Sequence, residues 1–367
     1  MVKRRRKIKK SFKYLLTLIL LIGISFGVYY FVFKDKNSFS KEAKTVIETD
    51  NLDVLKLEYS KTLDNAIASG KYNKEYFEAY SSINYHDQKN FIDIINTLLD
   101  KGYSADEINN IFDNLGSDNI TKLTKNDYLD LSEFFAVSNF DVDNYKRYMS
   151  YAGKKDAPIT DIVTYVNIGL DNEFYSVFNE VNDPSDYLVI VNKYNKLPSS
   201  YVPNDLVSLS DTPGASSSVN YQLRKIAAEA FTKMYNDAKK DGHILTPFSA
   251  YRSYSRQNEL YAGYVSRDGA ELADTYSARP GHSEHQTGLA IDVQSKNEVM
   301  KLNDSDYKWV EDNSYKYGFI IRYPQGKIDI TGYMYEDWHL RYIGIEHATK
   351  VHELNITYDE YYDLYIK

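Results

Sequence analysis

The sequence contains no cysteine among its 367 residues. This absence excludes disulfides, thiolate zinc sites, a cysteine nucleophile and a cysteine-linked lipid anchor. Any bound metal ion would therefore be held by histidine, aspartate or glutamate side chains. Histidine is also scarce, with seven in the chain. Histidines that fall close together and near carboxylates therefore carry information about a site.

An excess of positive charge is absent too, because 52 acidic residues face 44 basic ones and the formal net charge is −8. Eight of the basic residues lie within residues 1–13, which contain no acidic residue. The remainder of the chain is therefore more acidic than the total indicates. Because nucleic-acid binding needs clustered positive charge against the phosphates, this composition argues against a nucleic acid as partner.

Residues 14–33 are twenty uncharged residues that directly follow the basic stretch. A helix of this length, rising about 1.5 Å per residue, spans the hydrocarbon core of a bilayer. Basic residues stay on the cytoplasmic side, so the chain that follows is expected outside the cell. A cleavable signal peptide is the alternative, but no Ala-x-Ala site follows the run. We therefore expect a basic cytoplasmic tail at 1–13 and an uncleaved, single-pass membrane anchor at 14–33.

Residues 38–183 show a series of short helical patterns without a clear repeat period. The stretch FIDIINTLLDKG, residues 91–102, places apolar residues at three-four spacing and ends at a glycine. In the next stretch, Ser104 and Glu107 have the spacing of a capping box ahead of a helix. These patterns predict an all-α stalk or accessory region, and no motif in it indicates catalysis.

From residue 186 to residue 367 the pattern changes to interleaved helices and strands. Residues 187–207 are expected to form a strand followed by an extended segment. Helical patterns cover 223–242, 255–267, 305–318 and 345–355, and strand-like patterns cover 244–253, 288–293, 319–324 and 337–344. Because no parallel crossover is evident, we predict an α+β domain with a mainly antiparallel sheet flanked by helices.

One predicted strand, GLAIDV at 288–293, carries a carboxylate among apolar residues. Strand alternation directs Leu289 and Ile291 to the core and Asp292 to the other face. A buried carboxylate needs a partner, because an unpaired charge in an apolar environment is costly. An arginine or a metal ion would each serve, and His285 lies on the preceding loop, from which it could reach Asp292.

A second stretch, YEDWHLRY, places His339 on the strand face opposite Trp338 and Leu340, three residues after Glu336. Two imidazoles and one carboxylate are a ligand set of catalytic zinc, and a further glutamate can accept a proton from water. Spacing alone leaves ordinary hydrogen-bonding roles open for these histidines. It also leaves open a pair between His282 and His285.

These stretches resemble the paired signatures of the LAS-type zinc metallopeptidases, the group that contains D-alanyl-D-alanine carboxypeptidases of the VanY kind. SEHQTGLAID matches Ser-x-His-x-x-Gly-x-Ala-x-Asp, and EDWH followed by Arg-Tyr matches Glu-x-Trp-His. SAYRSYSRQNELY and YGFIIRYP fall in the family's order, so the resemblance covers about 186–351. Asp337 stands where relatives often carry proline, at a position expected to point away from the ligands.

The resemblance implies one zinc ion bound by His285, Asp292 and His339. It further implies that Glu336 acts as general base and then as general acid.

For the substrate, the resemblance implies that Arg252 stabilises the oxyanion or binds the terminal carboxylate, which suits a planar guanidinium. Ser283 and Gln257 are further candidates for hydrogen bonds to the substrate. Ordinary roles stay open for all three: a salt bridge for Arg252, a loop cap for Ser283 and an exposed helix position for Gln257.

The expected protein is thus a membrane-anchored zinc carboxypeptidase, with residues 186–367 as its catalytic domain. It is expected to remove the C-terminal D-alanine from peptidoglycan stem peptides outside the cell, with LD or DD specificity. One alternative is a peptidoglycan crosslink endopeptidase of the same fold. Another is a non-catalytic cell-wall-binding module, against which the complete set of ligands argues.

Overall fold

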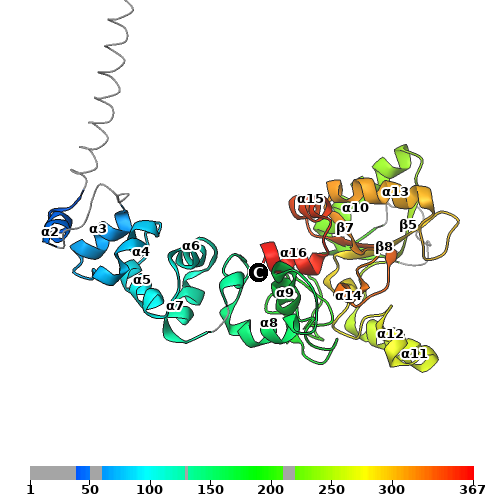
Figure 1. Ribbon diagram of the computed structural model, residues 1–367. Coiled ribbons are helices and arrows are strands. Elements are labelled where there is room, and N and C mark those ends of the chain that lie inside the picture. Colours follow the sequence, from blue (N-terminus) through cyan, green and yellow to red (C-terminus); the bar gives the residue numbers. More distant parts are fainter. Residues whose placement is uncertain (1–38, 50–59, 129–130, 210–219) are drawn as a thin grey trace, which may run out of the picture. The chain divides into compact units, whose positions relative to one another are not determined.

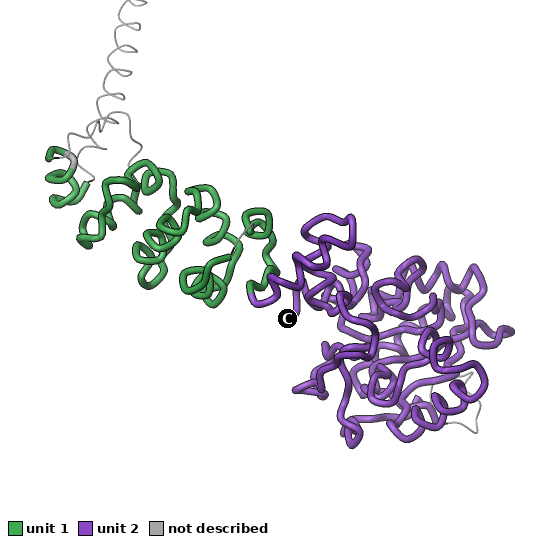
Figure 2. Tube along the Cα trace, turned by 60° about the horizontal axis from the view of Figure 1, so that its bottom comes forward, with its two compact units in different colours: residues 1–142 green, residues 143–367 purple. Residues whose placement is uncertain are grey.

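The chain forms two compact units, Met1–Val142 and Asp143–Lys367 (Figure 2). The computed structural model describes residues 39–49, 60–128, 131–209 and 220–367. The expected basic tail at 1–13 and the expected anchor at 14–33 lie outside these residues. A search of the described residues for a helix that is both long and apolar enough to span a bilayer finds none.

The described part of the first unit is built from short helices (Figure 1). They are α2 (Lys41–Thr49), α3 (Lys61–Ala68), η2 (Lys74–Tyr76), α4 (Phe77–Ser82), α5 (Phe91–Asp100), α6 (Ala105–Asn114), α7 (Ser117–Lys125) and η3 (Ser132–Phe134). The predicted capping box is present, since Glu107 N donates to Ser104 Oγ and Ser104 N donates to Glu107 Oε2. The core of the first unit includes the fully buried side chains of Ile95, Leu98 and Ile111.

The two units divide at 142/143, within the short helix η4 (Val142–Asn144), earlier than the change at 183–186 that the sequence indicates. Helices α8 (Tyr145–Ala152) and α9 (Ile159–Asn167) belong to the second unit. They contact the C-terminal end of that unit: Asn167 at the end of α9 donates to Asp363 at 3.1 Å. The role of the helical region as a stalk stays a prediction.

A four-stranded sheet forms the centre of the second unit, and its α+β class is as predicted. The strands are β5 (Leu245–Ser249), β6 (Ala290–Ser295), β7 (Phe319–Tyr323) and β8 (Glu336–Tyr342). Their order is β5-β6-β8-β7, and each neighbouring pair is antiparallel. Two small pairs accompany the sheet: β1 (Asn179–Glu180) is parallel to β2 (Asn195–Lys196), and β3 (Leu206–Ser208) is antiparallel to β4 (Gln222–Arg224).

Helices cover the sheet and surround its ends (Figure 1). They are α10 (Lys225–Lys240), α11 (Tyr254–Asp268), α12 (Ala270–Asp274), α13 (Asp304–Asn313), η6 (Ser314–Tyr317), α14 (Ile328–Thr331), α15 (Ile345–Leu354) and α16 (Tyr358–Tyr365). Leu289, Ile291 and Leu340 pack with Phe231 of α10 and Val310 of α13 in the main core. One face of the sheet is thus apolar as the alternation predicted, which leaves the opposite face for polar side chains.

The expected strand at the start of 187–207 is not formed, and this segment runs as turn and loop from Tyr187 to Tyr194, buried from Val189 onward. Val189 and Val191 are buried with Leu197 in a small cluster beside the sheet. The backbone here is satisfied by a side chain, since Arg341 Nη2 donates to the carbonyl of Val189 at 2.7 Å. An apolar run can therefore be buried without joining a sheet.

Candidate metal centre

Asp292 and His339 face each other across two central strands. They are direct partners in the antiparallel pairing of β6 with β8. Side chains of directly opposed residues lie close on one face of a sheet. Accordingly His339 Nδ1 lies 3.0 Å from Asp292 Oδ1. Strand register alone therefore brings two of the three predicted metal ligands together.

His285 reaches the same carboxylate from the turn that precedes β6, η5 (Glu284–Thr287). Its Nε2 atom lies 3.1 Å from Asp292 Oδ2, and its ring is 4.9 Å from that of His339 at an interplanar angle of 88°. The turn ends at Gly288 with φ of 68°, where an added Cβ would lie 2.9 Å from Leu206 Cδ2. The glycine allows both the left-handed backbone and the close approach that place His285.

Each imidazole has a fixed acceptor on the side away from Asp292. His285 Nδ1 lies 2.7 Å from the carbonyl oxygen of Ala250, which can only accept a hydrogen bond. The proton is therefore on Nδ1, and Nε2 keeps its lone pair. His339 has the opposite arrangement, because its Nε2 lies 3.4 Å from Glu284 Oε2 while Nδ1 faces Asp292. The two histidines thus present different nitrogens to the same point.

The donor atoms of His285, Asp292 and His339 all lie within 4.8 Å of one another, and all three residues are buried. Asp292 Oδ1 has no hydrogen-bond partner despite its burial. A buried oxygen without a hydrogen bond needs an explanation, and an ion is one. Two imidazoles and a carboxylate suit zinc and leave a coordination position open. The residues present therefore fit the metal that the sequence resemblance implies.

The charges around Asp292 keep its carboxylate ionised. Burial alone would raise the pKa of Asp292, but the neighbouring His285 and His339 hold that pKa well below its usual range. Burial alone would lower the pKa of His339, yet the neighbouring carboxylates of Asp292 and Glu284 raise the pKa to about 9. For His285, burial prevails and lowers the pKa. Asp292 is thus ready to bind a cation without first losing a proton.

Glu336 stands at the start of β8, beside the three candidate ligands but outside their set. Its Oε2 atom lies 3.8 Å from His339 Nδ1, and the residue is 8% exposed. Burial raises the pKa of Glu336 to about 8, and the nearby charge of Asp292 acts in the same direction. A carboxyl group with a pKa near neutrality can both accept and return a proton, which suits general acid–base catalysis.

Arg252 follows β5 and lies next to the centre, with Nη2 3.8 Å from Asp292 Oδ2. Two hydrogen bonds hold its guanidinium: Nη1 donates to Gln257 Oε1 and Nη2 donates to Ser249 Oγ, each at 2.7 Å. Gln257 is 1% exposed, and its Nε2 donates to the carbonyl of Ala278 at 2.7 Å. The structure therefore places Gln257 behind Arg252, away from the substrate contact that the sequence suggested.

A cleft of about 770 Å³ opens onto these residues. Arg252, Ser283, His285, Glu336 and His339 all line it, so the structure brings the predicted metal, acid–base and substrate residues to one cavity. Its further walls come from α11, which contributes Tyr264, and from aromatic residues outside that helix, among them Tyr221, Tyr276, Tyr323, Tyr333 and Trp338. Such a cleft has the size of a small-ligand site.

His282, which spacing left as a rival ligand, points elsewhere. Its Nδ1 lies 2.8 Å from the carbonyl oxygen of Asn192, and its ring packs edge-on against Tyr175. It is not part of the metal-binding cluster among the described residues. Asp337 also points away, as expected, since its Oδ2 accepts a hydrogen bond from Leu302 N.

A buried lysine lies behind one wall of the cleft. Lys193 Nζ donates to the carbonyl of Asp274 at 2.5 Å and lies 4.3 Å from the ring centroid of Tyr333. The rings of Phe174 and Tyr175 also face it. Burial lowers the pKa of Lys193 to about 8.

Three charged residues near the centre escaped the sequence analysis: Glu284, Arg322 and Arg341. Arg322 and Arg341 both donate to Glu284 Oε1, at 2.8 and 3.0 Å. Burial alone would raise the pKa of Glu284, but the two guanidinium groups hold that pKa far below its usual range. The sequence did contain a signal for them. Arg322 and Arg341 are charges inside the apolar strands FIIRY and HLRY, and Glu284 directly precedes a predicted ligand.

Comparison with known proteins gives consistent matches. The family model described as VanY, D-alanyl-D-alanine carboxypeptidase, matches residues 220–345. The chain is 44% identical to the Bacillus subtilis protein YodJ over 193 residues, which is 50% of this chain and 69% of YodJ. It is 35% identical to a D-alanyl-D-alanine carboxypeptidase of Enterococcus faecium over 187 residues, which is 49% of this chain and 58% of that protein.

Among solved structures, the chain is similar to the LD-carboxypeptidase LdcB, with 42% identity and a TM-score of 0.47. The match covers 53% of this chain and 94% of LdcB. A Zn(II) complex of a variant of the D,D-pentapeptidase VanY matches with 33% identity and a TM-score of 0.41, over 49% of this chain and 99% of that one.

Proposed function

Because the chain belongs to the VanY family of D-alanyl-D-alanine carboxypeptidases, we propose that it is a zinc-dependent carboxypeptidase that removes the C-terminal D-alanine from peptidoglycan stem peptides. The observation that carries the proposal is the cluster of His285, Asp292 and His339, whose donor atoms lie within 4.8 Å of one another beside Glu336. This arrangement suits hydrolysis of an amide at a cleft wide enough for a peptide end.

One zinc ion would be held by His285 Nε2, a carboxylate oxygen of Asp292 and His339 Nδ1. When bound, zinc supplies Lewis-acid activation of water and of the scissile carbonyl. Ala250 and Glu284 hold the two imidazoles in the tautomers that leave these nitrogens free. Acceptors of this kind behind ligating histidines fix ring orientation and strengthen metal binding.

Glu336 takes the part of the proton carrier. Its Oε2 atom lies on the ligand side of the cleft, where it accepts a proton from the attacking water and returns that proton to the leaving amine of D-alanine. The raised pKa of Glu336, about 8 in the metal-free protein, reflects a buried carboxyl that holds a proton readily.

Arg252 binds the negative charge of the substrate. It lines the cleft, and Gln257 and Ser249 already hold its guanidinium in place. The guanidinium can therefore donate hydrogen bonds to a terminal carboxylate or to the oxyanion. Ser283, which also lines the cleft, is the further candidate for a hydrogen bond to the peptide. The choice between LD and DD substrates depends on contacts with the residue before the terminal alanine.

One alternative is a crosslink endopeptidase of the same fold. A carboxylate-binding role for Arg252 argues against it, because an endopeptidase has no terminal carboxylate to bind. A non-catalytic wall-binding module would not need Glu336. We further propose that the protein acts outside the cell, held by a membrane helix at 14–33. The support for this location is the basic stretch followed by twenty uncharged residues.

The test is to incubate the purified chain with stem tetrapeptides and pentapeptides and to follow the products by mass spectrometry. Release of one D-alanine that requires both metal and Glu336, as judged with a chelator and with Glu336→Ala, is the expected result. A pentapeptide with an amidated C-terminus serves as the matched control, because it removes only the charge that Arg252 binds. Cleavage within this amidated peptide, with no release from either free stem, would favour the endopeptidase.

A further inference from the structure

A buried series of ion pairs starts at His339, on the side opposite its metal-facing nitrogen. His339 Nε2 lies 3.4 Å from Glu284 Oε2, and Glu284 Oε1 accepts hydrogen bonds from Arg322 and Arg341. None of these four residues is more than 4% exposed. A carboxylate held by two guanidinium groups has little freedom to move, so its position behind His339 is fixed.

The series continues from Arg322 to helix α16. Arg322 Nη1 and Nη2 donate to the two carboxylate oxygens of Asp359, at 2.6 and 3.2 Å. Asp359 also accepts from Asn192 Nδ2 at 2.7 Å. The ring of Tyr358, the preceding residue of α16, lies 5.7 Å from the guanidinium of Arg322 and 5.5 Å from that of Arg341.

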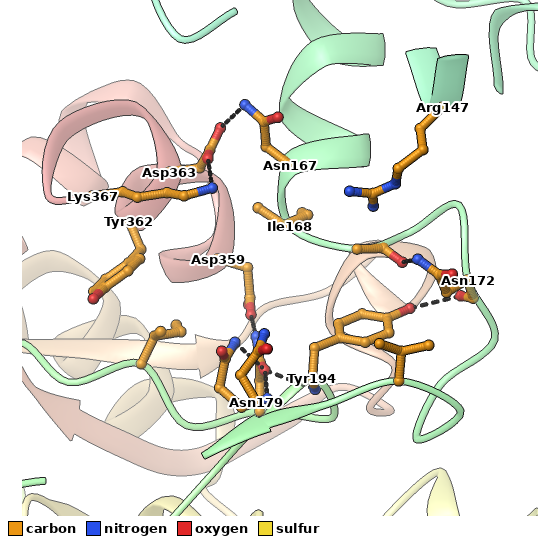
Figure 3. A pocket seen from close by; sticks show the side chains of 15 residues that line it. Arg147, Asn167, Ile168, Asn172, Asn179, Tyr194, Asp359, Tyr362, Asp363 and Lys367 are labelled. Atoms are coloured by element: carbon orange, nitrogen blue, oxygen red, sulfur yellow. Dashed lines mark hydrogen bonds and ion pairs between the residues drawn. The ribbon is translucent and has the colours of Figure 1, made fainter. Parts of the chain in front are cut away.

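Figure 3 shows Asp359 extending from α16 to the wall of a second cavity of about 500 Å³, which Asn192 also lines. The outer end of the series therefore lies at a different cavity from the cleft that Glu336 and His339 line. It also lies outside residues 220–345, the part of the chain that the family model matches. Helix α16 is thus joined to the metal centre by a series of charged side chains, in addition to the packing of its Tyr358 and Tyr361 with Ile320.

Fold stability is a weak reason for such a series. Replacing buried ion pairs by apolar residues of similar volume is often neutral or stabilising, because desolvation offsets the attraction. Orientation of His339 is a better reason. The backbone carbonyl of Ala250 fixes the tautomer of His285, but His339 needs an acceptor at Nε2 to present Nδ1 to the metal. Glu284 supplies this acceptor, and the hydrogen bonds from Arg322 and Arg341 hold its carboxylate in position.

We propose that Glu284 is a positioning residue of the metal centre and that Asp359, acting through Arg322, holds Glu284 in place. This inference rests on the proposed function, because it takes His339 as a zinc ligand. It makes α16 a functional part of the site, in addition to the residues that line the cleft.

The experiment compares the full chain with its Glu284→Gln and Asp359→Asn variants. Asp363→Asn is the matched control, since Asp363 lies one turn further along α16 and its side chain, like that of Asp359, is 3% exposed. Asp363 accepts from Asn167 and Lys367 and is not among the hydrogen-bond partners of Arg322. Three quantities are measured: zinc affinity by competition with a chromophoric chelator, the visible absorption of the cobalt(II)-loaded protein, and thermal unfolding of the metal-free protein.

Glu284→Gln is expected to weaken zinc binding by about 10- to 100-fold, the usual effect of removing such a support, and to shift the cobalt absorption. Asp359→Asn is expected to change both in the same direction by a smaller amount, and Asp363→Asn is expected to leave both unchanged. A merely structural role would lower the unfolding temperature of the metal-free protein without changing zinc affinity or the cobalt spectrum. That result for Glu284→Gln would overturn the inference.

If Glu284→Gln does not fold, the comparison of Asp359→Asn with Asp363→Asn decides, and equal zinc affinities would overturn the inference. Failure of the unaltered chain to bind zinc would instead refute the proposed function. The two failures are therefore distinguishable in one set of samples.

Discussion

The replacement of Gln257 by methionine tests how the cleft arginine is held. Methionine has a similar length and no strong hydrogen-bonding group, so the packing of this buried position is largely kept. The change removes the hydrogen bond from Arg252 Nη1 to Gln257 Oε1 and leaves the carbonyl of Ala278 without its 2.7 Å donor. Arg252 then keeps its hydrogen bond to Ser249 Oγ and its 3.8 Å ion pair with Asp292.

The expected magnitudes follow from these two bonds. A hydrogen bond to a charged group contributes about 1.5–3 kcal/mol, and each 1.36 kcal/mol of transition-state stabilisation is tenfold in rate. If Arg252 needs Gln257 to meet the substrate, kcat/KM should fall by about 10- to 100-fold. The unpaired carbonyl should lower the free energy of unfolding by about 1–3 kcal/mol.

The assay is release of D-alanine from a stem peptide by the single variants Gln257→Met and Arg252→Ala and by the double variant. If Gln257 acts only through Arg252, the double variant should be no slower than Arg252→Ala alone. Losses in kcat/KM that add across the two changes would refute this reasoning and return Gln257 to a direct role with the substrate.

Three further predictions concern other parts of the second unit. Glu336→Gln should lower kcat by about 10²- to 10⁴-fold, as expected for loss of a general base, while zinc affinity measured by chelator competition stays close to that of the unaltered chain; loss of zinc together with activity would contradict the assigned role. Leu340→Ala should lower the free energy of unfolding by about 2–5 kcal/mol in urea titration, because Leu340 is fully buried in the main core; a change below that range would mean that the core closes around the cavity. For Lys193, whose folded pKa of about 8 lies below the ordinary value of 10.5, the unfolded chain binds more protons between these pH values. The stability of the unaltered chain relative to Lys193→Met should therefore rise with pH from 8 to 10.5, by up to about 1.4 kcal/mol per pH unit, and a flat or falling difference in unfolding experiments would exclude a neutral buried lysine.

Strand alternation predicted the local part of the site from the sequence. It placed Asp292 and His339 on one sheet face, and their neighbours Ile291, Val293 and Leu340 pack in the core as expected. The expectation was wrong for Trp338, which lines the cleft instead of joining that core. The family resemblance then selected His285 over His282, which spacing had left open. In the structure His285 lies with Asp292 and His339, whereas His282 is hydrogen-bonded to the carbonyl of Asn192, and the choice of ligand stays a prediction.

Contacts between distant elements could not be predicted in this way. Arg322 meets Glu284 on one side and Asp359 on the other only after three elements pack together, and no local pattern encodes these contacts. Helix α16 itself was missed, although Thr357 and Glu360 form a capping box that the sequence displays. The sequence therefore contained a signal for the helix, its capping box, but none for the contact of Asp359 with Arg322.

The division between the units was also beyond local patterns. Short amphipathic helices look alike in sequence whether they pack with the preceding or the following part of the chain. Contacts between residues far apart in the chain, such as that of α9 with α16, place residues 143–167 in the second unit. For the same reason the apolar residues after Tyr187 could be interpreted as a strand, since burial in a loop leaves the same composition.

The direct pairing of Asp292 with His339 has a consequence for the order of events in biogenesis. The two residues belong to strands separated by α13 and β7 in the chain, so their pairing is a long-range contact that exists only once β6 and β8 have paired. A nascent or partly folded chain has isolated histidines and carboxylates that hold zinc weakly. The chain should consequently bind the metal tightly only after the sheet has formed. If β6 and β8 paired one residue out of register, His339 would point into the apolar core and the chain would remain without metal.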